Sequence, residues 1–229
     1  SIDGLRRGDR DRPTFATEYL PLPIIHKDGG FTLREIMTGR RMGTPIDTMT
    51  IEMATERCTE EVERFLAGTN AVYTYGGGSI YGYLNYPSRL TYTMTNPTSG
   101  GWTPRIFLQE VLAMKKLGYD AFQRGPWKFY VSSDWDEVLD DDYSNEYGGK
   151  TLRQRVADID GVAAPETADY LTNTSGYKAV LVQMKKQTVE GVQGMGLTTV
   201  RWTEQGGYDT AYKVACIMVP RLRKDANSN

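Results

Sequence analysis

The sequence predicts an α+β fold, and three stretches of the chain carry that prediction. Apolar residues recur at helical spacing between residues 47 and 67, with charged residues between them. Residues 14–42 carry two prolines and an alternating pattern, which favours an extended conformation. Near the end of the chain, apolar residues alternate on both sides of a glycine-rich turn at 204–207, which predicts a long hairpin. Separate helical and extended segments of this kind are typical of the α+β class.

The long helix is expected from Asp47 to Ala67. Asp47 or Thr48 can cap its start, and Gly68 ends it. At the rise of an α-helix it would be about 30 Å long. Its inward positions are apolar and its outward positions are mostly glutamate. The inward set is Ile51, Ala54, Cys58, Val62, Phe65 and Leu66, and the outward set is Glu52, Glu56, Glu60, Glu61 and Glu63.

The segment before this helix is expected to be extended from Thr14 to Met42. Two prolines exclude a helix over Leu20–Ile25 and favour the edge of a sheet. Asp28-Gly29-Gly30 predicts a turn, and Phe31–Ile36 alternates like a second strand. A hairpin with so little core of its own is marginal alone, so we expect it to lie on another surface.

The rest of the chain alternates between helices and strands. A proline at a first helical turn starts a second helix, and a short helix and two apolar strands follow. Glycines alternating with tyrosines over 76–87 predict tight passes where backbones approach closely. The expected elements are helices at 104–123 and 150–159, strands at 127–131 and 178–184, and a closing hairpin of 197–203 with 208–219.

Composition excludes several classes of protein. The 229 residues carry 27 basic and 29 acidic side chains, a net charge of −2, so the basic excess of a dedicated nucleic-acid-binding protein is absent. No stretch approaches the roughly 18 apolar residues of a membrane span, and no signal peptide is recognisable. Fifteen tyrosines against six phenylalanines favour interfaces and half-buried sheets.

No catalytic, cofactor or metal site is expected. His26 is the only histidine, which excludes a histidine-rich metal centre, and we interpret it as an interface residue. Gly76–Ser79 lacks the lysine of a phosphate-binding loop, so a structural turn is favoured. Asp140–Asp142 reads as a solvated helix end, and Cys58 and Cys216 as buried free thiols. The 29 acids offer many carboxylate pairs, but no local pattern selects one, so an enzyme remains only a weak alternative.

Several stretches resemble the Hong Kong 97-type shell proteins, the family of tailed-phage major capsid proteins and encapsulins. Residues 80–87 resemble the family's isoleucine-x-Gly-x-x-Asn-x-Pro passage, and the resemblance covers most of the chain from about Leu20. The other stretches that carry it are Leu20–Asp28 with Thr44–Thr48, Gly125–Ser132 with Thr151–Val156, Val182–Met184, and Ile217–Arg221. The resemblance is greatest for encapsulin-like capsid proteins of prophages. Family members normally have an N-terminal arm or helix before the position that matches Ser1.

The resemblance implies a division of the chain. Residues 1–43 would form the N-terminal segment and the extended loop, which lies across a neighbouring subunit. Residues 44–102 and 195–229 would form a peripheral domain around the long spine helix, and 103–194 an axial domain around the symmetry axes. The residues expected to contact a neighbouring subunit are Leu20, Leu22, Ile24, Ile25, His26, Lys27, Phe31 and Arg34. Arg57 and Arg64 are the expected DNA-facing residues.

The implied function is structural. The chain would be a major capsid protein that assembles through pentamers and hexamers into an icosahedral shell around double-stranded DNA. Its partners would be further copies of itself, decoration, portal and scaffolding proteins, and the packaged DNA through weak contacts; no membrane is involved. It would act in the virion after assembly in the host cytoplasm. An encapsulin shell around a protein cargo is the alternative.

Overall fold

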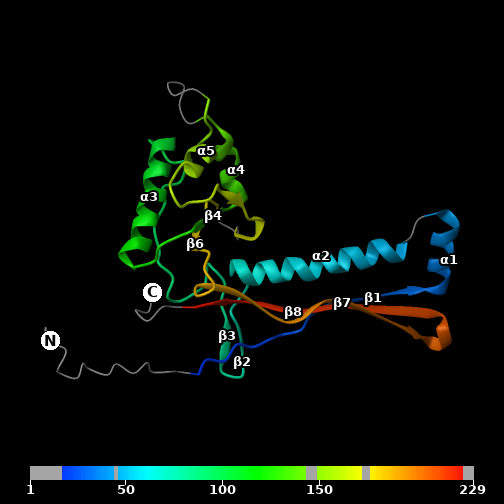
Figure 1. The fold of residues 1–229 in the computed structure, drawn as a ribbon. Coiled ribbons are helices and arrows are strands. Elements are labelled where there is room, and N and C mark those ends of the chain that lie inside the picture. Colours follow the sequence, from blue (N-terminus) through cyan, green and yellow to red (C-terminus); the bar gives the residue numbers. More distant parts are fainter. Residues whose placement is uncertain (1–16, 44–45, 143–148, 172–175, 224–229) are drawn as a thin grey trace, which may run out of the picture.

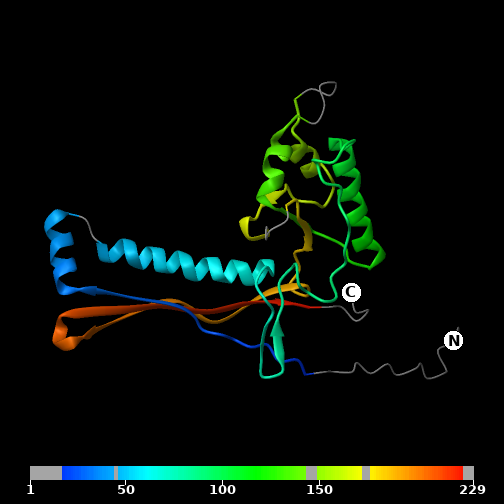
Figure 2. The same ribbon diagram turned by 180° about the vertical axis from the view of Figure 1, so that it is seen from behind.

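The computed structural model describes residues 17–43, 46–142, 149–171 and 176–223. Figure 1 shows two parts at an angle to one another, a long thin layer and a compact head. The long layer consists of strands β1, β7 and β8 with helix α2 above them, and the head consists of residues 104–183. The view from behind in Figure 2 shows the same arrangement, with α2 parallel to the strands over much of their length.

The long layer is a three-stranded antiparallel sheet with one helix on it. Its strands β1 (Ile25–Thr32), β8 (Asp209–Leu222) and β7 (Val189–Glu204) lie in the order β1-β8-β7. Helix α2 (Ile46–Ala67) covers one face, as the apolar spacing of the sequence predicted. The core between them consists of Ile25, Phe31, Ala54, Cys58, Tyr212, Val214 and Cys216. Burial of one large apolar side chain of this kind contributes about 1.5–3 kcal/mol.

Three predictions for the segment before α2 are wrong. Asp28-Gly29-Gly30 is not a turn, because β1 runs straight through it and pairs Gly29 with Tyr212. The strand predicted for Phe31–Ile36 ends at Thr32, where helix α1 (Leu33–Met42) begins. The position at a sheet edge is confirmed, since β8 is the partner of β1 among the strands that the structure describes. The expectation that this segment buries little of itself is also wrong for β1, which lies against its own α2 and β8.

Helix α1 starts with a reciprocal capping pair. The Thr32 hydroxyl accepts a hydrogen bond from the Glu35 backbone N–H at 3.3 Å, and the Glu35 carboxylate accepts one from the Thr32 backbone N–H at 2.9 Å. Both hydrogen bonds satisfy amides that a helix start leaves unpaired. The Glu35 carboxylate also accepts a hydrogen bond from the Thr32 hydroxyl at 3.0 Å, and the two hydrogen bonds that it accepts, from the backbone N–H and from the hydroxyl, lower the pKa of Glu35. Gly43, with φ of 73°, closes the helix in the left-handed conformation.

Short strands and a close backbone pass join α2 to the head. Strands β2 (Tyr73–Tyr75) and β3 (Gly78–Ile80) form a hairpin, and Gly76 and Gly77 in its turn have φ of 60° and 80°. The structural turn expected there is confirmed. At Gly82 a Cβ would lie 2.3 Å from the Phe65 carbonyl oxygen, so the predicted close approach of backbones is confirmed as well.

The head packs three helices and two 3-10 turns around a small sheet with strand order β5-β4-β6. Its core consists of Phe107, Val111, Trp127, Phe129, Val131, Trp135, Leu139, Leu152, Val156 and Val162. The elements are α3 (Pro104–Asp120), β4 (Trp127–Val131), η1 (Ser133–Trp135), α4 (Asp136–Asp140), α5 (Leu152–Ala157), β5 (Glu166–Thr167), η2 (Asp169–Leu171) and β6 (Ala179–Gln183). The expected strand at 127–131 is confirmed, and the other expected elements are present with shorter ends.

The closing hairpin is confirmed and is longer than predicted. Strand β7 starts at Val189, and Gln205–Gly207 (η3) form its turn to β8. The pairing of β7 with β8 shifts register between Gln193 and Met195 and again between Met195 and Thr198. Such shifts mark bulges, where one strand carries residues that its partner does not oppose.

Candidate functional site

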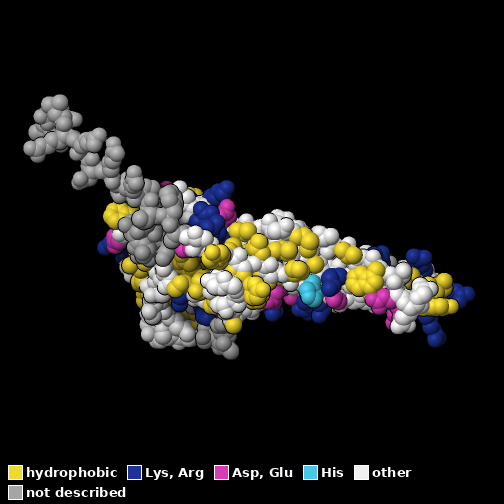
Figure 3. Space-filling model, turned by 90° about the horizontal axis from the view of Figure 1, so that it is seen from below, with side chains coloured by type: hydrophobic (Ala, Val, Ile, Leu, Met, Phe, Trp, Pro, Cys, Tyr) yellow, Lys and Arg dark blue, Asp and Glu magenta, His cyan; other side chains and the backbone are white. Residues whose placement is uncertain are grey.

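Among the described residues, the outer part of the sheet face opposite α2 is exposed, and we call it the bare face. Side chains alternate between the two faces of a strand, so residues next to Tyr212 and Val214, which face α2, point to the other side. Strand β7 adds Val200 and Trp202, which pair with Lys213 and Ala211 and are 55% and 39% exposed. Figure 3 views this face and shows hydrophobic side chains along the length of the layer, with the histidine and several charged side chains beside them toward its outer end. A long apolar face without a cover is typical of an interaction surface.

The residues predicted to contact a neighbouring subunit divide into two groups. Ile25 and Phe31 are 9% and 6% exposed and belong to the chain's own core, so their side chains are not available to a neighbour. Leu20 is half-buried. The exposed members of the set are Leu22, Ile24, His26, Lys27 and Arg34. Leu22 and Ile24, at 45% and 60% exposed, are the apolar members that a second chain could cover.

His26 belongs to a small polar group on the bare face. Its Nδ1 lies 3.3 Å from the Asp28 carboxylate, which also lies 3.3 Å from the Lys213 ammonium group. All three side chains are about half exposed, so their mutual attraction contributes little to stability. The group interrupts the apolar face with compensated charges.

Arg57 and Arg64 lie on α2 beside glutamates of the same helix. The Arg57 guanidinium contacts the Glu60 carboxylate at 2.9 Å, and that of Arg64 lies 3.8 Å from Glu61 and 5.2 Å from the ring centre of Tyr170. The helix carries six acidic and two basic side chains, so its outward face is negative. A negative face does not attract phosphate.

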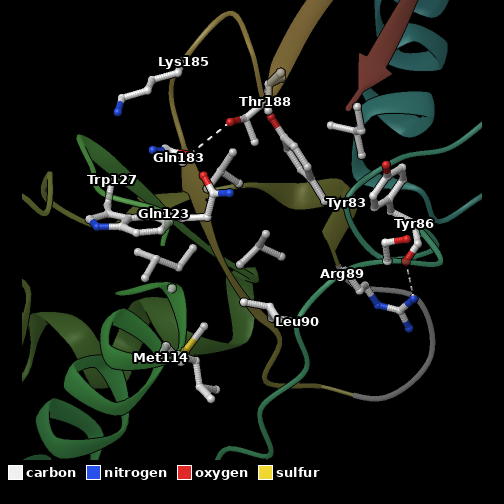
Figure 4. Close-up of a pocket in the computed structure, with 18 of the residues that line it drawn as sticks. Tyr83, Tyr86, Arg89, Leu90, Met114, Gln123, Trp127, Gln183, Lys185 and Thr188 are labelled. Atoms are coloured by element: carbon white, nitrogen blue, oxygen red, sulfur yellow. Dashed lines mark hydrogen bonds between the residues drawn. The ribbon is translucent and has the colours of Figure 1, made fainter. Parts of the chain in front are cut away.

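A hollow of about 890 Å³ lies between the head and the near end of the long layer. Figure 4 shows it between strand β6 on one side and the chain from Tyr83 to Leu90 on the other. Its apolar lining includes Leu90, Met114 and Trp127, and its polar lining includes the hydrogen-bonded pair Gln183 and Thr188. Of the residues that the structure describes, four cationic side chains line it and no carboxylate does; they are Arg89, Arg124, Lys185 and Arg223.

Tyr83 closes one end of the hollow. Its ring stacks on that of Tyr130 at 6.2 Å between centres. Burial, with a smaller contribution from Tyr130, raises the pKa of Tyr83 to about 12. The phenol therefore stays neutral at physiological pH and acts as a packing group with one polar edge.

The two cysteines do not resemble catalytic nucleophiles. Both are buried and free, as the sequence predicted, and they lie in the core between α2 and the sheet. Burial raises the pKa of both thiols, the reverse of what activates a nucleophile. Within the described ranges no three histidine, cysteine or acidic side chains are grouped to hold a metal ion. None of the described helices is long and apolar enough to cross a membrane.

Solved structures similar to this one include phage capsids and a virus-like particle. The capsid of Myoviridae phage XM1 superposes with a TM-score of 0.72 at 10% identity, over 97% of this chain and 79% of that chain. The virus-like particle from Pyrococcus furiosus gives 0.67 at 16% identity, over 91% and 76%. Mycobacterium phage Che8 gives 0.56 at 11% identity, over 86% and 66%. The chain therefore has the Hong Kong 97-type capsid fold, as predicted.

The family model that matches the sequence spans residues 1–219, and its description is "Family of unknown function (DUF6260)". The chain belongs to this family. No curated protein is significantly similar to it in sequence.

Sequence reasoning missed both surfaces described above. The hollow is lined from four separate segments, around residues 83–92, 114–127, 179–189 and 222–223, so no local motif marks it. The bare face had a local signal in the alternation of Val200 and Trp202 with polar residues. That alternation identifies two faces of a strand but does not tell which face is covered.

Proposed function

We propose that this chain is the major capsid protein of a tailed phage, and that it assembles through pentamers and hexamers into an icosahedral shell around double-stranded DNA. The observation that carries the proposal is the long layer, a sheet with a helix on one face and a bare apolar face on the other. A protein that acts as a monomer rarely exposes a large apolar surface. The fold is the one that the phage XM1 capsid also has.

Repeated contacts between copies would cover this surface. Head-to-tail contacts that close around an axis give rings, and curved rings give a closed shell. A stable interface between two proteins buries about 1,200–2,000 Å² in total, and a thin elongated subunit offers a large perimeter for several of them. The binding free energy of each contact can be small, because every subunit makes many contacts.

Burial within the chain removes some residues from the expected contact set. Leu22 and Ile24 precede β1 and are exposed, so they are the apolar anchors that we assign to a neighbouring subunit. Ile25 and Phe31 would instead hold β1 in place for that contact. In this proposal residues 1–43 form the N-terminal segment and extended loop, whose exposed side chains contact a neighbour, residues 44–102 and 195–229 form the peripheral domain, and 103–194 form the axial domain.

We assign no enzymatic role to the chain. The thiols are buried with raised pKa, and the carboxylates that form ion pairs in the head serve as structural partners. For example, the Arg153 guanidinium contacts Asp136 and Asp140 at 2.6 and 2.7 Å. The hydrogen bonds from Thr167 and Arg153 lower the pKa of Asp136, which keeps it ionised for this contact.

The packaged DNA would make weak, local contacts with the inner surface. Since α2 is negative outside, contacts through Arg57 and Arg64 would require their glutamate partners to turn away. Portal, scaffolding and decoration proteins complete the proposed set of partners, and the virion, assembled in the host cytoplasm, is the proposed location.

Particle mass tests the proposal directly. The purified full chain, at 25.7 kDa per subunit, should form particles of megadalton mass in analytical ultracentrifugation and closed shells in electron micrographs. A monodisperse monomer or small oligomer at concentrations up to tens of micromolar, across a range of salt and with coexpressed phage proteins, would refute it.

The likeness to the Pyrococcus furiosus virus-like particle favours a second candidate, a shell that encloses a protein cargo. Both functions predict particles, so the contents of the purified particles distinguish the two functions. Nuclease-protected DNA in particles from the native source supports the capsid, and a stoichiometric second protein without nucleic acid supports the cargo shell.

A further inference from the structure

We infer that the hollow between β6 and residues 88–92 is a binding site for an extended acidic segment of another protein, which adds to β6 as a further strand. This inference does not depend on shell assembly. The observations that carry it are the free edge of β6, the unpaired chain opposite it, and the one-sided charge of the lining.

Among the described strands, β6 is paired on one edge only. It pairs with β4 on that edge, in a register that opposes Val182 to Lys128 and Val180 to Tyr130. Backbone hydrogen bonds from Ser132 to Lys178 and from Met184 to Pro126 continue this pairing at its two ends. In an antiparallel pair, the residues between these positions direct their N–H and C=O groups away from the partner. Ala179 and Leu181 therefore present theirs toward the hollow, which both residues line.

The opposite wall is chain without a strand partner. Residues 88–92 belong to no helix or strand, and Leu90 and Tyr92 are 49% and 41% exposed. Within the part of the chain that the structure describes, no backbone hydrogen bond is recorded for 90–92. The hollow thus separates two stretches of main chain that both have unused polar groups. An inserted strand would satisfy those of β6, which is the mode of recognition called β-augmentation.

The positive charges of the lining favour an acidic partner. Arg223 already contacts Glu190 at 2.5 Å, and the Arg89 guanidinium donates to the Tyr86 carbonyl oxygen at 2.8 Å. Arg124 and Lys185 have no recorded ion pair among the described residues. Two cations without carboxylates, beside an apolar floor of Met114, Leu181 and Trp127, complement a strand that alternates acidic and apolar side chains.

The test uses the full chain and a fluorescein-labelled peptide that alternates glutamate with valine. We expect a saturable rise in fluorescence anisotropy, weakened by salt, and little binding of the matching peptide with lysine in place of glutamate. Lys185→Glu and Arg124→Glu should each weaken binding about tenfold, because each replaces an attraction with a repulsion. Lys186→Glu is the matched control, since Lys186 is the next residue, is 85% exposed and does not line the hollow.

The pairing of the added strand with β6 is tested by changing the peptide, so the protein itself keeps its native sequence. Two further peptides carry backbone N-methyl groups, one on all valines and the other on all glutamates. At least one of them should lose binding, since alternate N–H groups of the added strand face β6. Absence of saturable binding by the parent peptide would overturn the site, and so would equal effects of the Lys185 and Lys186 variants. Unchanged binding of both methylated peptides would overturn the pairing with β6.

Discussion

The ring of Tyr212 lies directly over Gly29, its cross-strand partner, so that a Cβ at position 29 would be 2.3 Å from the tyrosine hydroxyl oxygen. From this position the ring stacks on Phe31 at 5.3 Å, and its hydroxyl donates to the Thr50 carbonyl oxygen of α2 at 3.4 Å. One side chain thereby joins β1, β8 and α2. The absence of a side chain at residue 29 is what makes room for it.

Gly29→Ala should therefore destabilise the long layer. The new methyl group would displace the tyrosine ring from its stack and from Thr50, and overpacking of this kind costs about 1–3 kcal/mol. The free energy of unfolding in urea measures it. Gly30→Ala is the control, because its Cβ would meet nothing nearer than 3.4 Å. Equal stability of the two variants would contradict the packing described here.

Aspartate at two adjacent positions should separate assembly from folding. Ile25 is buried opposite Cys216, so Ile25→Asp places an unpaired charge in the core and should prevent folding. Ile24 is 60% exposed, so Ile24→Asp should leave a folded subunit that no longer forms shells. Circular dichroism reports the folding and electron microscopy the particles. Intact shells from Ile24→Asp would remove that residue from the proposed interface.

The core thiols should make the protein sensitive to alkali. Burial raises the pKa of Cys58 and Cys216 in the folded state, so the folded state holds these protons more tightly than the unfolded chain does. Their contribution is full below the unfolded pKa of about 8.5 and is lost as the pH rises through the folded values. The stability of the native protein should fall as the pH rises above about 8.5.

The double variant Cys58→Ala with Cys216→Ala is the control for this prediction. It loses some packing at every pH, but its urea midpoint should change less over the same range. Parallel pH curves for the native protein and the double variant would show that other groups cause the loss. Thiol reagents should label neither cysteine at neutral pH before unfolding.

Tyr83 should be titrated only at extreme pH. Its pKa is raised to about 12, so its contribution to stability is full below about 10, the value for an exposed tyrosine, and is lost toward 12. The difference between the absorbance titrations of the native protein and Tyr83→Phe at 295 nm isolates this phenol. A midpoint near 10 in that difference would mean that the end of the hollow is open to water.

The sequence predicted the helix and strand segments more reliably than their ends. The spacing of Ile51, Ala54 and Cys58 identified α2, because a helix that covers a sheet must keep one apolar stripe. The turn expected at Gly29 was wrong for a physical reason. Glycine serves turns and close packing equally well, and only the position of Tyr212, far away in sequence, shows which role applies.

Helix α1 was missed although its signal is present. Thr32 and Glu35 have the spacing of a capping box, but the alternation from Phe31 to Ile36 matches a strand as well. Short segments are ambiguous in this way because few positions distinguish the two periods. The surfaces could not be predicted at all, since they depend on which distant segments meet.

In the proposed shell, the two register shifts of β7 would have a consequence for the curvature. From Gln193 to Thr198 the strand advances five residues, while its partner advances three, from Met218 to Ala215, so β7 carries two more residues over the same span. A sheet whose edge strand is longer than the strand beside it curves, because bulges bend the strand that carries them. In a closed shell, part of the curvature would then come from the shape of each subunit, and the interfaces between subunits would need to provide only the rest.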